Sequence, residues 1–396
     1  MRSLKAQFFL SYAILGSLTP LLTVFLKDQK GLDEQQIGLA MSMSGAANLL
    51  SPVVMTLLAD KKLQTRHILA LSYAATSVVL LTLLTATPVG VTLALMALYG
   101  LSIVAMFPLQ DGMFFAAERE HERLGTEVVP YTGVRVWGTA GFILPSVAMW
   151  WIVGRVGSET PAVLGAVSFC LASLLNALFT LPAVRPSRAP AGQARVPTFD
   201  ALRVLARPET RWLCLALIIA AGSSVTYHYF FPIYLKERIG LRPGLIPLVI
   251  NVGVLLEVFY TLAYPRLIKW IGAKGILIGG LACMVSRLWL LGTFPSLPMA
   301  ILVQLGHGLE IVSMFVLPPM LLNRLAGDAF RNSMQGAFSM MMGAARLAGS
   351  IFAGIAVKRD MLDAMQGAAA IGCLALALVL VSFHPSNPEN KSEIRI

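Results

Sequence analysis

Charged side chains are scarce in this sequence: they make up 13% of its 396 residues, whereas hydrophobic residues make up 57%. Soluble domains carry about twice that share of charge, so the composition excludes an ordinary water-soluble domain. The mean hydropathy is +0.73, and apolar runs of about twenty residues recur from end to end. This pattern is typical of a helical membrane protein.

Cysteine is also rare. The four cysteines, Cys170, Cys214, Cys283 and Cys373, all fall inside apolar runs and show no CxxC spacing, which favours packing roles over a redox or zinc motif. The sequence contains no H-E-x-x-H or other catalytic motif. It therefore predicts neither an enzyme nor a metal site, and it implies no cofactor.

Acidic residues are fewer than basic ones, 20 against 31, which gives a net charge of +11. A basic balance can indicate nucleic-acid binding, but Lys and Arg also gather in loops that face the anionic cytoplasmic leaflet. Most of them fall in loops on one side if the N-terminus is inside. We therefore expect a multi-pass protein of the lipid bilayer with both termini cytoplasmic and no nucleic-acid partner. The first apolar run, which ends at Leu26, is too long for a signal peptide and is predicted to be a span.

The apolar runs predict twelve membrane spans in two sets of six. The expected spans are 6–26, 35–59, 67–86, 90–116, 133–154, 161–182, 211–235, 244–265, 275–293, 298–322, 333–357 and 363–383. A Pro- and Arg-rich stretch separates the sets and is predicted to be a linker. The predicted domains are an N-terminal bundle (1–182), a cytoplasmic linker (183–210), a C-terminal bundle (211–384) and a cytoplasmic tail (385–396).

An internal repeat relates the two sets. The segment FLKDQKGL at Phe25–Leu32 matches YLKERIGL at Tyr234–Leu241. These segments end the first and seventh spans, so the two halves are predicted to be parallel repeats around a site near the membrane midplane. This is a transporter architecture.

Ionisable residues inside spans are costly, at least about 2.5–3.5 kcal/mol for Arg or Asp at a helix centre, so they need partners or a function. Arg287, His307 and Glu310 lie on a predicted helical hairpin. His307 and Glu310 share a helix face, and Arg287 is expected at a similar depth. Glu257 and Glu310 are candidate counter-charges for Arg287, and His307 could relay a proton. We interpret these four residues as a proton-coupling group; a network that only fixes helix packing is the alternative.

The N-terminal half carries Asp111 and Arg135 within predicted spans. A mutual pair or a shared substrate contact would offset their cost, and Trp137 and Phe142 could stack on a substrate ring. A purely structural ion pair is the alternative. After the second span, Asp60 and Lys61 are predicted to form a conformational switch in which Asp60 bridges to a neighbouring helix; a solvated loop charge is the alternative.

Three segments resemble the major facilitator superfamily, in particular the oligosaccharide–proton symporters and their phenylpropionate-permease and nucleoside–proton symporter relatives. They are GVRVWGTAGF (133–142), LIKWIGAK followed by MVSR (267–274 and 284–287), and LGHGLE (305–310). The resemblance implies an all-α membrane protein with the twelve-helix major facilitator fold, monomeric and in the inner membrane. It also implies that Arg287, His307 and Glu310 couple transport to protons and that Asp111 and Arg135 bind the solute.

The sequence departs from the sugar permeases of this group at several positions. His228, beside Tyr227 in the seventh span, stands where those permeases have Asp, and Phe142 stands where they have Trp. Glu257 lies about one helical turn later than their carboxylate, and Arg346 is displaced by about one position. Proton coupling therefore transfers better than sugar specificity, and Tyr227 and His228 remain further candidate solute contacts.

We expect a proton-coupled symporter that takes up a small organic solute, such as a sugar, nucleoside or aromatic acid, by alternating access. An uncoupled facilitator or a proton-exchange exporter is the first alternative. An intramembrane metalloenzyme with His228, His307 and Glu310 as ligands, or a transporter-like sensor, would belong to other classes.

Overall fold

The computed structural model describes residues 1–60, 64–104, 106–125, 131–182, 205–318, 320–321 and 331–382. The described residues are helical almost throughout. Most of the predicted linker and the whole predicted tail lie outside them. The switch assigned to Asp60 and Lys61 stays a prediction. Lys61 lies outside the described residues, and only the backbone of Asp60, the last residue of its helix, is described.

The described residues of the first half form eight helices that account for the first six predicted spans. They are α1 (Arg2–Leu18), α2 (Leu22–Asp28), α3 (Glu34–Asp60), α4 (Thr65–Thr85), α5 (Val89–Ile103), α6 (Met106–Arg123), α7 (Tyr131–Val156) and α8 (Thr160–Phe179). The first span is broken near Pro20 into α1 and α2, because proline lacks the amide hydrogen that the helix ladder needs. Helices α5 and α6 together occupy the fourth predicted span.

The second half begins with α10 (Pro208–Glu237), the 3₁₀ turn η1 (Pro243–Leu245) and α11 (Ile246–Thr293). Within α11 the chain breaks at Gly272, whose φ of 69° favours glycine, so this helix supplies two spans. The tenth span is a succession of short pieces: α12 (Leu297–Leu302), η2 (Val303–Gly306), α13 (His307–Ile311) and η3 (Val312–Val316). Helices α15 (Arg331–Arg359) and α16 (Met361–Ser382) complete the described chain.

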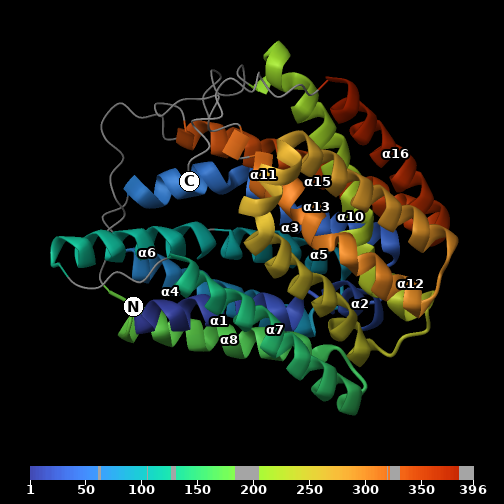
Figure 1. Ribbon diagram of the computed structural model, residues 1–396. Coiled ribbons are helices and arrows are strands. Elements are labelled where there is room, and N and C mark those ends of the chain that lie inside the picture. The colour runs from blue at the N-terminus through green and yellow to red at the C-terminus, as the bar shows by residue number, and fades with distance from the viewer. Residues whose placement is uncertain are drawn as a thin grey trace.

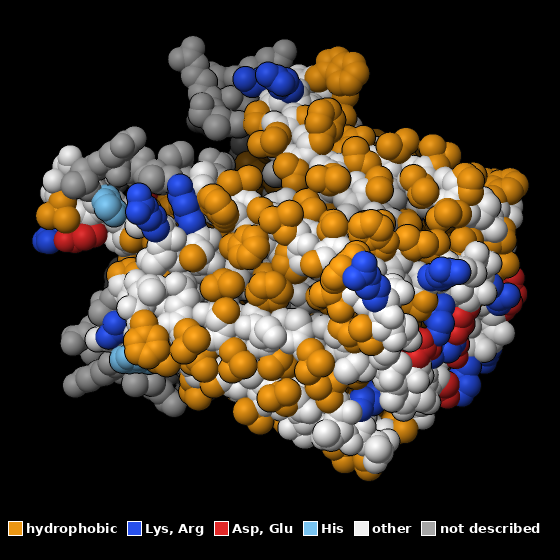
Figure 2. Space-filling model, turned by 90° about the horizontal axis from the view of Figure 1, so that it is seen from below, with side chains coloured by type: hydrophobic (Ala, Val, Ile, Leu, Met, Phe, Trp, Pro, Cys, Tyr) orange, Lys and Arg blue, Asp and Glu red, His pale blue; other side chains and the backbone are white. Residues whose placement is uncertain are grey.

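Nine helical segments among the described residues are long and apolar enough to cross a membrane. The segment from Pro243 to Thr293 contains two spans, and α3 and the pair α5–α6 supply the remaining two predicted ones. On the face shown in Figure 2, hydrophobic side chains cover the middle and charged side chains gather toward the two ends. This distribution is typical of a protein whose middle zone is surrounded by lipid.

The helices form two bundles (Figure 1). In the first bundle α1 packs on α7 and α8, and α4 packs on α5 and α8; in the second, α16 packs on α10 and α11. Across the boundary, α3 packs on α15 and α7 packs on α11. Gly38 of α3 and Gly354 of α15 meet backbone to backbone there, so that these two helices approach closely.

The bonds between the bundles lie toward the end of the molecule away from the N-terminus, which we call the opposite end. Ion pairs join Lys27 to Glu237, Asp28 to Lys236 and Asp33 to Lys358. Deeper in the molecule, Asn251 of α11 donates a hydrogen bond of 3.1 Å to Ser146 of α7. Among the described side chains, no other hydrogen bond or ion pair crosses between the bundles.

The internal repeat is confirmed in three dimensions. Gly31 and Gly240 both adopt positive φ, 65° and 72°. Leu32 donates its amide hydrogen to the carbonyl of Leu26 at 3.1 Å, and Leu241 makes the matching bond to Leu235 at 2.9 Å. Each repeat therefore ends its first span with the same glycine-dependent cap.

Candidate functional site

Arg287 is the centre of the cluster predicted in the C-terminal half. The hairpin is present, since α11 ends at Thr293 and α12 begins at Leu297. Arg287 is only 2% exposed and forms an ion pair with Oε2 of Glu310, which is fully buried. Its Nη1 donates to Nδ1 of His307 at 2.8 Å, and its Cζ lies 3.7 Å from the centre of the Tyr227 ring. The structure therefore brings Arg287, His307 and Glu310 together and adds Tyr227 to them.

The helix segment that carries His307 and Glu310 is irregular. A 3₁₀ turn (η2) precedes α13 and a π-helical turn (η3) follows it; such turns often occur at functional sites. Gly308 allows this segment to pack tightly, because a Cβ there would lie 2.6 Å from both the carbonyl oxygen of Leu256 and the ring of Tyr260. Tight packing holds His307 and Glu310 at the depth of Arg287.

The network around Arg287 is not saturated. Oε1 of Glu310 and Nε of Arg287 are buried and have no hydrogen-bond partner among the described residues. The free carboxylate oxygen can accept a proton without displacing the Arg287 bond to Oε2. If protonation then weakens the ion pair, the guanidinium still has His307 and the Tyr227 ring as partners.

Asp111 and Arg135 occupy neighbouring positions in the N-terminal half without forming a direct ion pair among the described side chains. Asp111 accepts a hydrogen bond of 2.9 Å from the hydroxyl of Tyr131. The guanidinium of Arg135 lies over the ring of Tyr12, with Cζ 4.3 Å from the ring centre. Arg135 is nevertheless close enough to interact electrostatically with both Asp111 and Glu257.

Glu257 therefore faces the N-terminal bundle from α11. Its electrostatic partner is Arg135, whereas Glu310 is the carboxylate that neutralises Arg287. The sequence offered both glutamates as counter-charges of Arg287, and the structure selects one of them. Glu257 thus lies at the boundary between the N-terminal group and the C-terminal group.

The two aromatic residues predicted near Arg135 are placed differently. Trp137 is two residues from Arg135 and so lies on nearly the opposite side of α7. Its side chain is 44% exposed. Leu144 and Trp151, one and two heptads further along α7, are also exposed, at 59% and 54%, so the three residues form an outward apolar side of that helix. Phe142 is half-buried where α7 crosses Gly16 of α1. The structure does not bring Trp137 to the Arg135 group.

A cavity of about 190 Å³ lies between α1, α3, α5, α6 and α10, and aromatic residues line it. Tyr99 and Phe107 come from the N-terminal bundle and Tyr229 from the C-terminal bundle. Phe107 packs on Tyr12, the ring that carries Arg135, with 5.0 Å between ring centres. The cavity therefore borders the Arg135 group. The only sequence signal for these residues was that they are aromatic and lie within or beside predicted spans.

His228 follows Tyr227 in α10, and the two rings meet edge to face with 5.4 Å between their centres. Nδ1 of His228 bonds to the carbonyl oxygen of Ser224 at 2.9 Å, and its buried Nε2 has no partner in the part of the chain that the structure describes. Its ring centre is 6.0 Å from that of His307. Among the residues that the structure describes, no three His, Cys, Asp or Glu side chains gather in a way that could hold a metal ion.

The N-terminal bundle contains a buried polar network that was not predicted from the sequence. Tyr73 bonds through its hydroxyl to the amide of Gln7 and the hydroxyl of Ser11, both at 2.7 Å. Ser11 donates to Gln110 at 2.6 Å, and Asn176 donates to Gln7 at 2.6 Å. The network joins α1, α4, α6 and α8, and it fixes the helix that presents Asp111, the residue after Gln110.

Two helical bundles with charged groups buried at their centre define a membrane transporter rather than an enzyme. The chain belongs to the MFS_1 like family, whose family model matches residues 1–365. This confirms the resemblance to the major facilitators that the sequence motifs carried.

Curated relatives are permeases. The chain is 28% identical over 249 residues to a maltose permease of Geobacillus stearothermophilus, covering 60% of this chain and 57% of that one. It is 23% identical over 389 residues to the xanthosine permease of Escherichia coli strain K12, covering 92% and 89%. The chain thus spans little more than half of the maltose permease but most of the xanthosine permease.

Solved structures share the fold. The nucleoside transporter NupG superposes with a TM-score of 0.83 at 18% identity, covering 97% of this chain and 99% of that one. A peptide transporter POT in complex with sulfate gives a TM-score of 0.72 at 13% identity, covering 96% and 92%. The protein is therefore an all-α, multi-pass membrane transporter with the major facilitator fold of two six-helix repeats.

Proposed function

We propose that this protein is a proton-coupled symporter that takes up a small organic solute across the inner (plasma) membrane. The observation that carries the proposal is the buried Arg287–Glu310 ion pair, which is held by His307 and leaves one carboxylate oxygen free. The excess of Lys and Arg in one set of loops supports cytoplasmic termini. The protein is expected to act as a monomer.

The proton step follows from this network. A proton binds Glu310 at Oε1, which removes the negative charge that holds Oε2 against Arg287. Arg287 then relies on His307 and Tyr227, so the cluster can rearrange without leaving the guanidinium unpaired in an apolar interior. When the bundles rock and Arg287 approaches Glu310 again, the ionised carboxylate is favoured and the proton leaves on the other side.

The solute would bind between Asp111 and Arg135 on one side and the C-terminal group on the other. Tyr131 orients Asp111, Tyr12 supports Arg135, and Glu257 approaches from the second bundle. Phe142, Tyr227 and His228 remain candidate contacts, whereas the outward position of Trp137 argues for a lipid-facing role. The names of the relatives favour a nucleoside or a sugar as the solute.

Alternating access requires the opposite end to open. With the termini in the cytoplasm, that end faces outward, and the ion pairs between bundles lie there. The described arrangement is thus closed toward the outside. Rocking of the two bundles about the central site would break these pairs and admit the solute.

The test is solute-induced proton movement in proteoliposomes that contain the purified protein and an internal pH dye. Addition of a transported nucleoside or sugar should acidify the interior, and Glu310→Gln should abolish acidification and accumulation while retaining counterflow of labelled solute. Glu120→Gln, which neutralises an exposed glutamate of α6 that pairs with Arg123, is the matched control and should behave as wild type. Counterflow without any proton movement would favour an uncoupled facilitator instead.

A further inference from the structure

Arg346 of α15 is a cation that has no counter-charge among the described residues. Its guanidinium lies over the ring of Phe315, with Cζ 4.5 Å from the ring centre. Its Nε is buried and finds no hydrogen-bond partner in the described ranges. The other two intramembrane arginines differ, because Arg287 pairs with Glu310 and Arg135 has Asp111 and Glu257 within electrostatic reach.

His228 supplies a second unpartnered group beside this cation. It lies within electrostatic reach of Arg346, as it also does of Arg287. Because Nδ1 faces the carbonyl oxygen of Ser224, it carries the ring proton, and the buried Nε2 of a neutral ring is a hydrogen-bond acceptor. The two side chains therefore offer donors for a negatively charged oxygen on one side and an acceptor for an N–H or O–H group on the other.

Tyr229 connects this pair to the aromatic cavity. It lines the cavity of about 190 Å³ together with Phe107 and Tyr99, and it lies within electrostatic reach of Arg346. A planar ligand in the cavity would contact Tyr229, which follows His228 in α10 and lies within electrostatic reach of Arg346, and Phe107, which packs on Tyr12. An uncompensated charge at membrane depth is costly, and an anionic ligand would offset that cost.

We propose that Arg346 and His228 form an anion-recognition subsite for solutes that carry an ionised oxygen next to an N–H or O–H donor. This assignment rests on the proposed transport function, because it names the class of solute that the cavity prefers. The guanidinium donates to the ionised oxygen, and Nε2 of His228 accepts from the neighbouring donor. An uncharged analogue lacks the first interaction.

The experiment compares probes in matched pairs on the purified protein. Xanthosine carries a second ring oxygen that inosine lacks, and its acidic ring ionises to give a negatively charged oxygen beside a ring N–H, so inosine is the neutral member of this pair. In the second pair, 3-phenylpropanamide and 3-phenylpropionate differ by a charge. Competition with a labelled nucleoside in counterflow and the ligand-induced rise in melting temperature give two readouts. The wild type should prefer the acidic member of a pair by about tenfold or more, the effect of one charge-assisted hydrogen bond.

The variants separate recognition from folding. Arg346→Gln should abolish this preference, whereas Arg346→Lys should keep part of it because the charge remains. Arg155→Gln is the matched control, since Arg155 also lies over an aromatic ring, that of Trp151 at 3.9 Å, but is exposed at the opposite end. It should behave as wild type.

Two results would overturn the subsite while leaving the transport function intact. In the first, the wild type exchanges neutral solutes normally and shows no preference for acidic probes. The other is an unchanged preference in Arg346→Gln. Absence of binding and counterflow for every nucleoside, sugar and aromatic acid would instead overturn the proposed transport function, and the subsite with it.

Discussion

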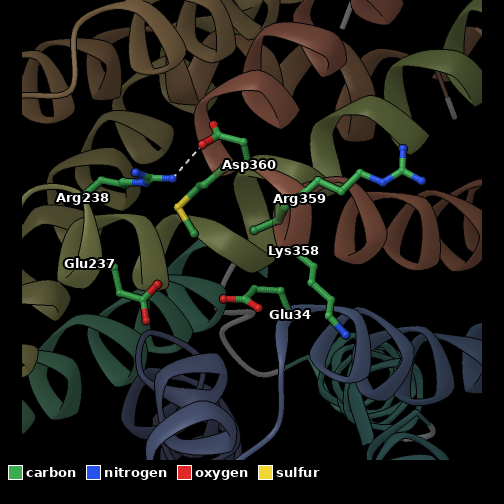
Figure 3. Close-up of a pocket in the computed structure, with 8 residues that line it drawn as sticks. Glu34, Glu237, Arg238, Lys358, Arg359 and Asp360 are labelled. Atoms are coloured by element: carbon green, nitrogen blue, oxygen red, sulfur yellow. Dashed lines mark hydrogen bonds and ion pairs between the residues drawn. The ribbon is translucent and has the colours of Figure 1, made fainter.

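Lys27, in the last turn of α2, forms an ion pair with Glu237 at the end of α10. The same lysine pairs with Glu34, the first residue of α3. Figure 3 shows the carboxylates of Glu34 and Glu237 pointing toward one another from separate bundles at a surface hollow of about 290 Å³. Lys27 therefore places one positive charge between two negative ones, and its loss would leave repulsion across the bundle boundary.

Removal of this charge should open the opposite end, which faces outward in the proposed orientation. Lys27→Gln is expected to raise the ratio of outward-open to outward-closed molecules about fivefold, roughly 1 kcal/mol. Spin labels at Val156 and Arg242, in a background without the native cysteines, would report the distance by double electron–electron resonance. Lys236→Gln should have a smaller effect, because Lys236 pairs with one carboxylate, that of Asp28.

The control for this series is Arg123→Gln. It removes an exposed ion pair with Glu120 inside α6 and should leave the distance distribution unchanged. An unchanged distribution in Lys27→Gln would mean that these pairs do not hold the outward end closed.

The pH dependence of the outward closure should differ from that of transport. The hydrogen bond from Lys358, supported by the amide hydrogen of Gln36, holds the pKa of Asp33 below its ordinary value of 3.8. A carboxylate with a depressed pKa stabilises the closed form above that ordinary value, and its contribution is lost as the pH falls through the lowered pKa. This ion pair should therefore be unaffected between about pH 5 and 8.

Solute-driven proton uptake measured between about pH 5 and 8 distinguishes the role of Asp33 from that of Glu310. Asp33→Asn should shift the spin-label distances but keep the shape of the pH profile, whereas Glu310→Gln should flatten the profile. A profile that flattens in Asp33→Asn would assign pH sensing to the outward closure instead.

The hydrogen bond between Asn251 and Ser146 should act as an interior latch between α11 and α7. Both side chains are buried; Nδ2 of Asn251 makes the bond to Ser146, and Oδ1 has no hydrogen-bond partner among the described residues. A double-mutant cycle with Asn251→Ala and Ser146→Ala should give a coupling energy of about 0.5–1.5 kcal/mol in favour of the outward-closed state. The spin-label ratio above measures it, and a coupling near zero would contradict the latch.

The polar network around Tyr73 should stabilise the N-terminal bundle. Tyr73→Phe removes the hydroxyl that Gln7 and Ser11 contact and leaves their buried groups short of a partner, at a cost of about 1–3 kcal/mol. The melting temperature of the purified protein should fall accordingly. Tyr99→Phe is the matched control: Tyr99 lines the cavity, and its hydroxyl makes no hydrogen bond to a described residue, so little change is expected. Equal losses in both variants would contradict a specific role for the network.

The sequence predicted the helices and the central hairpin because both depend on local signals. Apolar run length determines a span, and the spacing of His307 and Glu310 determines that they share a face. The short turn at Thr293–Pro298 joins the two arms of the hairpin and places Arg287 at the same depth as His307. The 2.8 Å contact between these two side chains confirms this. Such features need no knowledge of how distant helices pack.

Features that depend on packing could not be predicted in the same way. Gln7, Tyr73 and Asn176 are isolated polar residues in different spans, and nothing local indicates that they meet. The choice of Glu310 over Glu257 as partner of Arg287 also depends on how α11 and α13 are rotated. Trp137 is the exception, since its helical spacing with Leu144 and Trp151 could have indicated an outward side.

The repeat has a consequence for how such a chain could have arisen. Lys27 is equivalent to Lys236, and Asp28 to Glu237, and each lysine pairs with the acid of the other repeat. A single six-helix ancestor with one such Lys–acid pair would already be complementary to a second copy across a two-fold axis. Fusion would make that homodimer permanent and free the two interiors to diverge. The outward seal would then be an ancestral subunit interface, preserved inside one polypeptide while the Arg287 cluster evolved in only one of its halves.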